Sequence, residues 1–209
     1  MRSVSVLTAG LCGFIATTAS AALTNPDVPS WRGDALTSYA EFDTFTSASG
    51  GPNFADAGGG GFQLFNFGGP GAVVASSGNI YSPAGALDIH LYSLGPAVNP
   101  AEAVLNISWG GTMLNTSDVR AFIGGTYYDA VSVDQRSSVA SPFGGSVDTW
   151  AFTFNLSGAA TGDLAFFFGN DGAHGSLDAV SVDVRSVPAP GALALVIVAG
   201  AVGSRRRRD

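Results

Sequence analysis

The middle of the chain is built from short runs in which apolar and polar side chains alternate. In residues 86–92, for example, Leu87, Ile89 and Leu91 alternate with polar residues. A repeat of two residues places alternate side chains on opposite faces of a β-strand, and no stretch keeps a helical repeat over three turns. Glycine, serine, asparagine and aspartate separate the runs and favour turns. These features constrain the chain to an all-β fold.

Ten runs of this kind predict ten strands. They cover residues 39–45, 62–67, 72–76, 86–92, 103–109, 119–123, 127–134, 148–156, 164–168 and 178–184. A glycine-rich segment, residues 47–61, predicts a long flexible loop. Antiparallel strands with one apolar face bury that face when two sheets pack together. We therefore expect an antiparallel β-sandwich of jelly-roll type, with the phenylalanines filling the space between the sheets.

The N-terminus has the three zones of a secretory signal peptide in the required order. Arg2 supplies a positive charge, residues 4–18 are predominantly apolar, and Ala19 and Ala21 supply the small residues of an A-x-A cleavage site. We expect the signal peptide to form a helix and to be cleaved before Ala22. A buried N-terminal helix is the alternative, but it gives no reason for this order of zones.

The C-terminus also consists of three distinct pieces. They are, in order, the turn Val187-Pro188-Ala189-Pro190, the apolar run 191–203, and the basic cluster Arg205, Arg206, Arg207 and Arg208. Proline ends regular structure because it fixes φ and lacks an N–H. The apolar run prefers lipid to water, but as a helix it would reach only ~20 Å, less than the ~30 Å hydrocarbon core of a bilayer. A block of arginines tends to stay on the cytoplasmic side.

This arrangement resembles the PEP-CTERM sorting signal of exported bacterial surface proteins over residues 187–209. Ala189 stands where that family usually has glutamate between the two prolines. The resemblance implies export, a short membrane helix, and removal of the tail by an exosortase-type protease, with the mature protein at the cell surface or secreted. An ordinary C-terminal membrane anchor is the alternative. Between a signal peptide at 1–21 and this signal, residues 22–186 form one predicted domain.

The predicted domain is acidic and lacks cysteine. Its four arginines stand against fifteen acidic residues, which gives a net charge of −11, and the chain has no lysine. Such a surface repels nucleic acid and anionic lipid. The single cysteine, Cys12, belongs to the signal peptide, so packing rather than disulfides must stabilise the domain. This composition suits an extracellular domain that contacts neutral glycans or divalent cations.

Signatures of catalysis are few. The two histidines, His90 and His174, are far apart in the sequence, and the domain has neither a cysteine nucleophile nor a Gly-x-Ser-x-Gly turn. Glu41 and Asp43 share one face of a predicted strand and superficially match the paired carboxylates of a glycosidase. Thr46 stands where a Glu-x-Asp-x-x-Glu site would have its third acid. We therefore expect no catalytic activity.

The oxygen-bearing side chains suggest a calcium site, because Ca²⁺ takes six to eight oxygen ligands. Asp178 falls on the inward phase of a valine-rich strand, where an unpaired carboxylate is costly. The first and last strands of a jelly roll are often neighbours, which would bring N-terminal acids close to it. The candidate ligands are Glu41, Asp43, Asn170, Asp171 and Asp178. They loosely resemble the structural calcium site of carbohydrate-binding β-sandwiches. The alternative makes Asp178 a turn residue bonded to backbone amides.

Aromatic side chains outside the inward phase, or near strand ends, could stack on sugar rings. The candidates are Trp31, Tyr39, Tyr81, Tyr92 and Tyr128. Packing in the core or at its rim is the alternative for each of them.

The sequence leaves three functional hypotheses open. The first is a non-catalytic surface or matrix protein, sorted by its tail and associated with the envelope or exopolysaccharide. The second is a carbohydrate-binding module, with or without calcium. The third and least favoured is a polysaccharide-active enzyme. A saturable ligand and an aromatic platform would distinguish the second hypothesis from the first.

Overall fold

The computed structural model describes residues 22–58, 61–142 and 144–188. Most of both predicted signals, with the helices expected for them, lies outside these ranges, although Ala22, Val187 and Pro188 lie inside. The residues outside include Ala19 and Ala21 of the cleavage site and Ala189, Pro190, Arg205, Arg206, Arg207 and Arg208 of the sorting signal.

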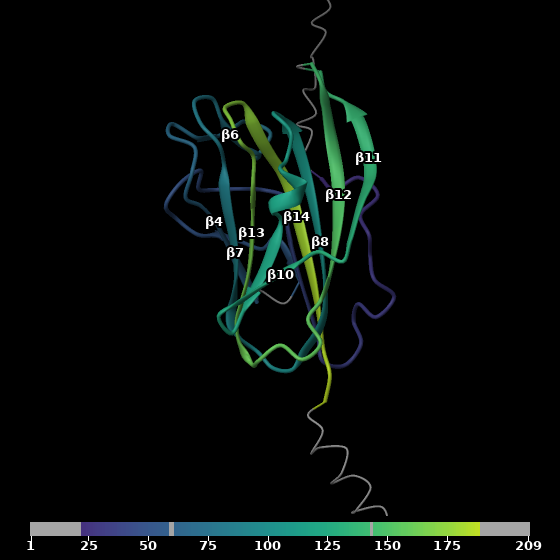
Figure 1. The fold of residues 1–209 in the computed structure, drawn as a ribbon. Coiled ribbons are helices and arrows are strands. Elements are labelled where there is room, and N and C mark those ends of the chain that lie inside the picture. The colour runs from purple at the N-terminus through teal and green to yellow at the C-terminus, as the bar shows by residue number, and fades with distance from the viewer. Residues whose placement is uncertain (1–21, 59–60, 143, 189–209) are drawn as a thin grey trace, which may run out of the picture.

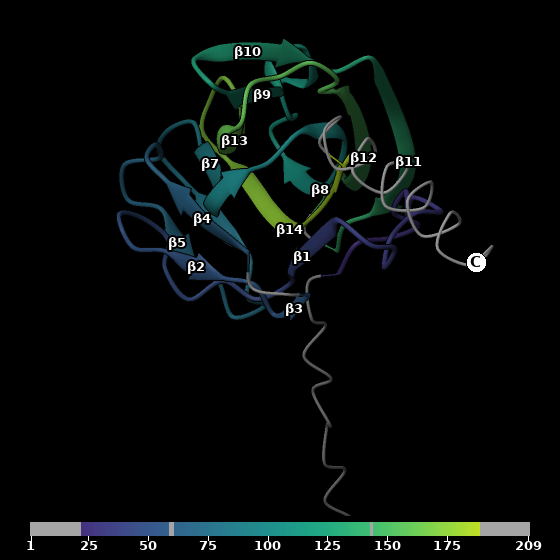
Figure 2. The ribbon, with the colours of Figure 1, turned by 90° about the horizontal axis from the view of Figure 1, so that it is seen from below.

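The described residues form two antiparallel sheets that pack face to face (Figures 1 and 2). The larger sheet has the order β11 (Ser132–Ala140), β12 (Ser146–Asn155), β8 (Pro100–Gly111), β14 (Gly175–Ser186), β1 (Thr37–Phe42) and β3 (Ala57–Gly58), with β6 (Ile80–Ser82) beside β14 and β5 (Val73–Val74) beside β6. The smaller sheet has the order β10 (Thr126–Asp129), β9 (Arg120–Ile123), β13 (Gly162–Gly169), β7 (Asp88–Ala97), β4 (Phe62–Asn66) and β2 (Asn53–Phe54). One turn of 3₁₀ helix, η1 (Thr116–Asp118), precedes β9. The all-β prediction is confirmed.

The core lies between the inward faces of the two sheets. In β8 the predicted inward residues Leu105, Ile107 and Trp109 are at most 2% exposed. Phe154 of β12 meets Phe166 of β13 across the interface, with 5.5 Å between the ring centroids. Full burial of an aromatic side chain of this size contributes roughly 1.5–3 kcal/mol to stability. These rings therefore provide much of the stability of a domain without disulfides.

The strand pairing confirms one long-range expectation and corrects two local ones. β1 pairs with β14, so the first long strand and the last are neighbours. The single strand expected over residues 127–134 is instead two strands, β10 and β11, which belong to different sheets. The alternation changes phase at this break, because the apolar residues Ala130 and Val131 are adjacent in the sequence. The glycine-rich segment 47–61 contains the short strands β2 and β3, which local alternation did not indicate.

An N-terminal strap, residues 22–36, runs along the outside of the larger sheet (Figure 1). The Asp27 N–H donates to Asn106 Oδ1 at 2.7 Å, and Asn106 Nδ2 donates to the Asp27 carbonyl at 3.0 Å. Arg32 makes a two-pronged ion pair with Asp183, at 2.5 and 2.6 Å. The polar side chains beneath the strap are therefore buried: Ser181 and Asp183, which alternate with the core valines of β14, are 1% and 0% exposed.

A β-bulge corrects the predicted orientation of Asp178. Leu177 is paired with Trp109 and Ala179 with Ser108, so Asp178 is an extra residue in β14. The bulge lets Leu177 and Val180 both enter the core, although they are three positions apart. Asp178 instead lies on the outer face, where its Oδ2 accepts a hydrogen bond from Ser108 Oγ at 3.4 Å. Burial raises the pKa of this carboxyl group.

Candidate functional site

The outer face of the smaller sheet carries a continuous surface of rings. Cross-strand pairing sets Phe65, His90 and Phe167 in one row, from β4, β7 and β13. A second row contains Tyr92, Phe122 and Tyr127, with the small Ala165 between Tyr92 and Phe122. Phe67 follows β4 directly and adds to the same surface. The aromatic face, as defined here, consists of Phe65, Phe67, His90, Tyr92, Phe122, Tyr127 and Phe167.

Most neighbouring rings of the aromatic face touch edge-on or tilted, and Phe65 and Phe67 are stacked, with 5.7 Å between their centroids. Ring centroids are 4.7 Å apart for Phe67 and His90, and 4.6 Å apart for His90 and Phe167. Tyr127 lies 5.9 Å from Phe167 and 4.8 Å from Phe122. Phe67 and Tyr127 remain 56% and 57% exposed, and the other rings are half-buried. Contiguous exposed apolar surface of this kind is typical of an interaction site.

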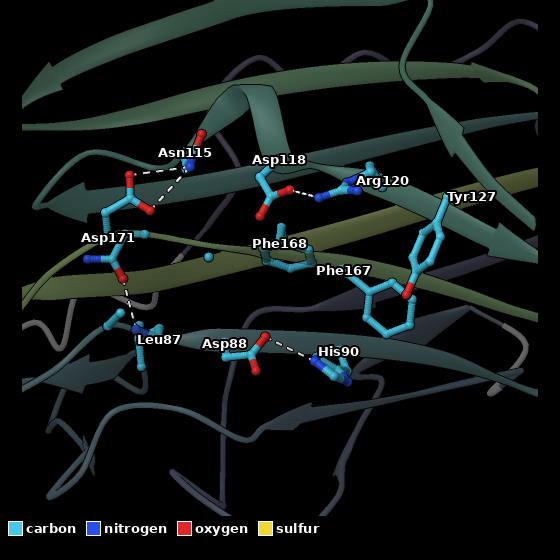
Figure 3. Close-up of a pocket in the computed structure, with 13 residues that line it drawn as sticks. Leu87, Asp88, His90, Asn115, Asp118, Arg120, Tyr127, Phe167, Phe168 and Asp171 are labelled. Carbon is cyan, nitrogen blue, oxygen red and sulfur yellow. Dashed lines mark hydrogen bonds and ion pairs between the residues drawn. The ribbon is translucent and has the colours of Figure 1, made fainter.

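A hollow of about 460 Å³ opens at one end of the aromatic face (Figure 3). Its floor includes His90, Phe167 and Tyr127. Its polar lining comes from three elements and two loops: Asp88 from β7, Asp118 from η1, Arg120 from β9, and Asn115 and Asp171 from the adjoining loops. Concave sites that combine aromatic walls with a few polar groups are typical of small-molecule and sugar recognition.

Hydrogen bonds orient the polar groups of the hollow. His90 Nε2 lies 3.0 Å from Asp88 Oδ1, and its Nδ1 lies 2.8 Å from the Tyr92 hydroxyl, so both ring nitrogens are engaged. Burial raises the pKa of Tyr92, and the Asp88 carboxylate raises it further. Arg120 pairs with Asp118 and lies over the Tyr127 ring, 5.5 Å from its centroid. Side chains held in this way lose less conformational freedom when a ligand binds.

The floor of the hollow is anchored by a buried amide. Asn170 is 6% exposed; its Oδ1 accepts the Leu87 N–H at 2.9 Å and its Nδ2 donates to the Gly172 carbonyl at 2.6 Å. Asn115 Nδ2 donates to the two carboxylate oxygens of Asp171 at 3.2 and 3.3 Å. These bonds tie the loop after β13 to the start of β7 and to the loop before η1.

Of the five aromatic residues predicted to stack on sugars, only Tyr92 lies on the aromatic face. Trp31 was expected to be exposed but is 9% exposed, because the strap packs it against the larger sheet. The Tyr39 ring lies under the Arg32 guanidinium, with 3.9 Å between the ring centroid and Arg32 Cζ. Tyr128 packs against the core. Tyr81 binds His174 Nδ1 at 2.7 Å, at a strand of the larger sheet.

Six residues of the aromatic face were not predicted as ligand contacts. The expectation that the phenylalanines fill the core was wrong for five of them, Phe54, Phe65, Phe67, Phe122 and Phe167. Phe65, Phe122 and Phe167 occupy the outward phase of strands whose inward phase is mainly apolar, whereas Phe67 follows β4 and Phe54 lies in the short strand β2. The recurrence of rings at alternate positions, as in Phe65 and Phe67 or His90 and Tyr92, was the available signal.

The candidate calcium ligands fall into two separate groups. Glu41, Asp43 and Asp178 lie near one another on the larger sheet, where β1 meets β14. Asn170 and Asp171 line the hollow on the smaller sheet. Among the residues that the structure describes, no group of three or more histidine, cysteine or acidic side chains is arranged to hold a metal ion. Calcium binding therefore stays a prediction, with no single site for the five candidates.

Asp43 carries a pKa raised to about 6, chiefly by burial and then by the negative charges of Glu41 and Asp56. Its Oδ1 is buried and has no hydrogen-bond partner among the described residues. Because the carboxyl group binds its proton more tightly in the folded state, its contribution to stability is lost as the pH rises from about 4 to about 6. The ionised carboxyl group therefore lowers the stability of the fold at neutral pH.

The substitution Asp43→Asn is expected to stabilise the protein at pH 7 by about 1 kcal/mol, after allowance for solvent screening. At about pH 4 the gain should largely vanish, because the native carboxyl group is then protonated. Urea denaturation at both pH values measures the difference. Asp34→Asn, at an exposed position, is the control and should change little. A gain for Asp43→Asn that is equal at both pH values would contradict the interpretation.

No family model, curated protein or solved structure matches this chain. Within the described residues, no helix has the length and apolar character needed to span a membrane.

Proposed function

We propose that this chain is an exported β-sandwich protein of jelly-roll type that binds polysaccharide through the aromatic face. The observation that carries the proposal is the unbroken set of rings on the outside of the smaller sheet, next to a hollow with carboxylates and amides. When a ligand covers those rings, their apolar surface leaves water, and this burial favours binding. The flat apolar faces of sugar rings match such a surface, and polar groups at its rim can bond sugar hydroxyls.

The terminal signals are the basis for the proposed location of the protein. The signal peptide and the PEP-CTERM-like tail imply export, exosortase processing, and a final place in the envelope or extracellular polysaccharide. The acidic charge of the domain fits a partner other than nucleic acid. The protein would act there by binding, without catalysis. Stabilisation by calcium and the less favoured polysaccharide-active enzyme stay predictions from the sequence.

The test is binding of the exported protein, purified from cells, to a panel of bacterial and plant polysaccharides with and without EDTA. Phe167→Ala should weaken polysaccharide binding at least tenfold, because a few aromatic side chains commonly supply most of the binding energy of an interface. Tyr127→Ala should weaken binding less, since Tyr127 lies at the edge of the aromatic face. Affinity electrophoresis or isothermal titration calorimetry gives the dissociation constants.

Tyr81→Ala is the matched control, because Tyr81 belongs to the other sheet and was a competing candidate for sugar stacking. Its affinity should equal that of the unmodified protein. Equal weakening by Tyr81→Ala and Phe167→Ala, or no saturable binding at all, would overturn the proposal. The intact mass of the same preparation reports processing, which should leave a chain from Ala22 to the proline turn.

A further inference from the structure

The hollow beside the aromatic face is lined by more negative than positive charge. Asp88 of β7, Asp118 of η1 and Asp171 of the loop after β13 contribute three carboxylates, against one cation, Arg120. The side chains of Asp88 and Asp118 are each 57% exposed, so both can meet a ligand. Arg120 is already engaged by Asp118, and His90 is held between Asp88 and Tyr92. Three carboxylates and one guanidinium group together give a net charge of −2.

The three carboxylates are spread around the hollow (Figure 3). Asp88 lies beside His90, Asp118 lies on the opposite side, and Asp171 lies near Asn115. They do not form a group that could hold one metal ion. Carboxylates placed at intervals suit a ligand whose positive charges are also placed at intervals.

The rings beneath the carboxylates also favour cations. The face of an aromatic ring attracts an ammonium or guanidinium group, by about 0.5–1 kcal/mol at exposed sites and more when the cation is desolvated. The molecule already shows this preference, because Arg120 lies over Tyr127. The net charge of −11 over residues 22–186 would further attract a polycation and repel a polymer of uronic acids or sulfated sugars.

We infer that the hollow and the aromatic face select polysaccharides of amino sugars with free, protonated amines. This inference rests on the proposed polysaccharide-binding function and names its ligand class. The rings contact the apolar faces of the sugars, and Asp88, Asp118 and Asp171 each accept charge-assisted hydrogen bonds from an ammonium group. A neutral or N-acetylated chain would keep the ring contacts and lose these ionic ones.

The experiment compares three probes on the exported protein: glucosamine oligomers, N-acetylglucosamine oligomers of the same length, and galacturonate oligomers, in a buffer of low ionic strength that keeps the amines protonated. Glucosamine oligomers should bind most tightly. The variant Asp118→Asn should weaken their binding about fivefold, and Asp88→Asn/Asp118→Asn should weaken it more. Both variants should weaken the binding of N-acetylglucosamine oligomers by a smaller factor, about twofold, because only hydrogen bonds to neutral groups are then lost.

Asp134→Asn is the matched control. Asp134 also pairs with an arginine two residues away, and its side chain is also 57% exposed, but it lies on the larger sheet. This variant should bind glucosamine oligomers as the unmodified protein does, although its net charge changes equally. Equal losses for Asp134→Asn and Asp118→Asn would reduce the effect to overall charge and overturn the inference.

The remaining outcomes separate the inference from the proposed function. Equal binding of the acetylated and free-amine oligomers, both sensitive to Phe167→Ala, would overturn the amino-sugar preference and support polysaccharide binding. Tighter binding of galacturonate oligomers would do the same if Phe167→Ala weakens it. Binding of none of the three probes, together with no binding in the polysaccharide panel, would overturn both.

Discussion

Replacement of Arg32 with alanine is expected to lower the free energy of unfolding by about 3–5 kcal/mol, the range typical when one partner of a buried ion pair is removed. The Asp183 side chain is fully buried, and Arg32 supplies both of its ionic hydrogen bonds. The variant would leave a carboxylate without compensation beneath the strap, and it would remove the guanidinium that covers Tyr39. Urea denaturation followed by tryptophan fluorescence measures the loss.

The pH dependence of Arg32→Ala should follow the titration of Asp183. Burial raises the pKa of Asp183, and Arg32 opposes that rise. Without Arg32 the pKa should rise further, so the ionised form costs most at neutral pH, and acidification toward protonation should recover part of the stability. The added change Asp183→Asn should also recover part of it.

Arg136→Ala is the control for Arg32→Ala. Arg136 pairs with the exposed Asp134 at 2.8 Å and also contacts the strap, through the Asn25 carbonyl at 3.3 Å. Exposed ion pairs contribute about 1 kcal/mol or less, so this variant should lose far less stability. Similar losses for the two arginines would show that the burial of Asp183 does not set the cost.

Phe166→Ala is expected to cost about 3–5 kcal/mol, the usual range for a buried phenylalanine truncated to alanine. Phe166 is 0% exposed and meets Phe154 from the opposite sheet, so the variant leaves a cavity where the sheets join. The domain has no disulfide to limit the damage. Thermal unfolding should show a correspondingly lower midpoint.

Phe167→Ala is the neighbouring control. Phe167 follows Phe166 in β13 and faces the outside of the same sheet, among the rings of the aromatic face. Its removal should cost less than half as much stability as that of Phe166, while it should impair polysaccharide binding. The opposite ranking of the two stabilities would contradict the assignment of inner and outer faces of β13.

The alternation of side chains was enough to predict most of the long strands, because the core sides of those strands are mainly apolar. Leu105, Ile107 and Trp109 illustrate this in β8. Alternation could not predict what covers the outer faces, since that depends on contacts between distant parts of the chain. From the alternation, Asp183 and Asn106 would face solvent, but the strap covers them and buries them.

The candidate site was harder to predict for a related reason. A phenylalanine on the outward phase of a strand resembles a core residue in sequence, and Phe167 stands between two core phenylalanines. The bulge at Asp178 likewise shifts the inward–outward alternation of β14 by one residue, and no glycine or proline at this position indicates it. The carboxylates of the hollow come from positions 88, 118 and 171, and only the packing of strands unites them.

The strap has a consequence for the timing of folding. The strap residues form hydrogen bonds with partners far along the chain. Thr24 bonds Thr149, Asp27 bonds Asn106 and Arg32 bonds Asp183, at sequence separations of 125, 79 and 151 residues. Contacts of such sequence separation form slowly. During synthesis Arg32 would therefore lack its partner Asp183 until the last strand of the domain is present, so the Arg32 contact can form only at the end of folding.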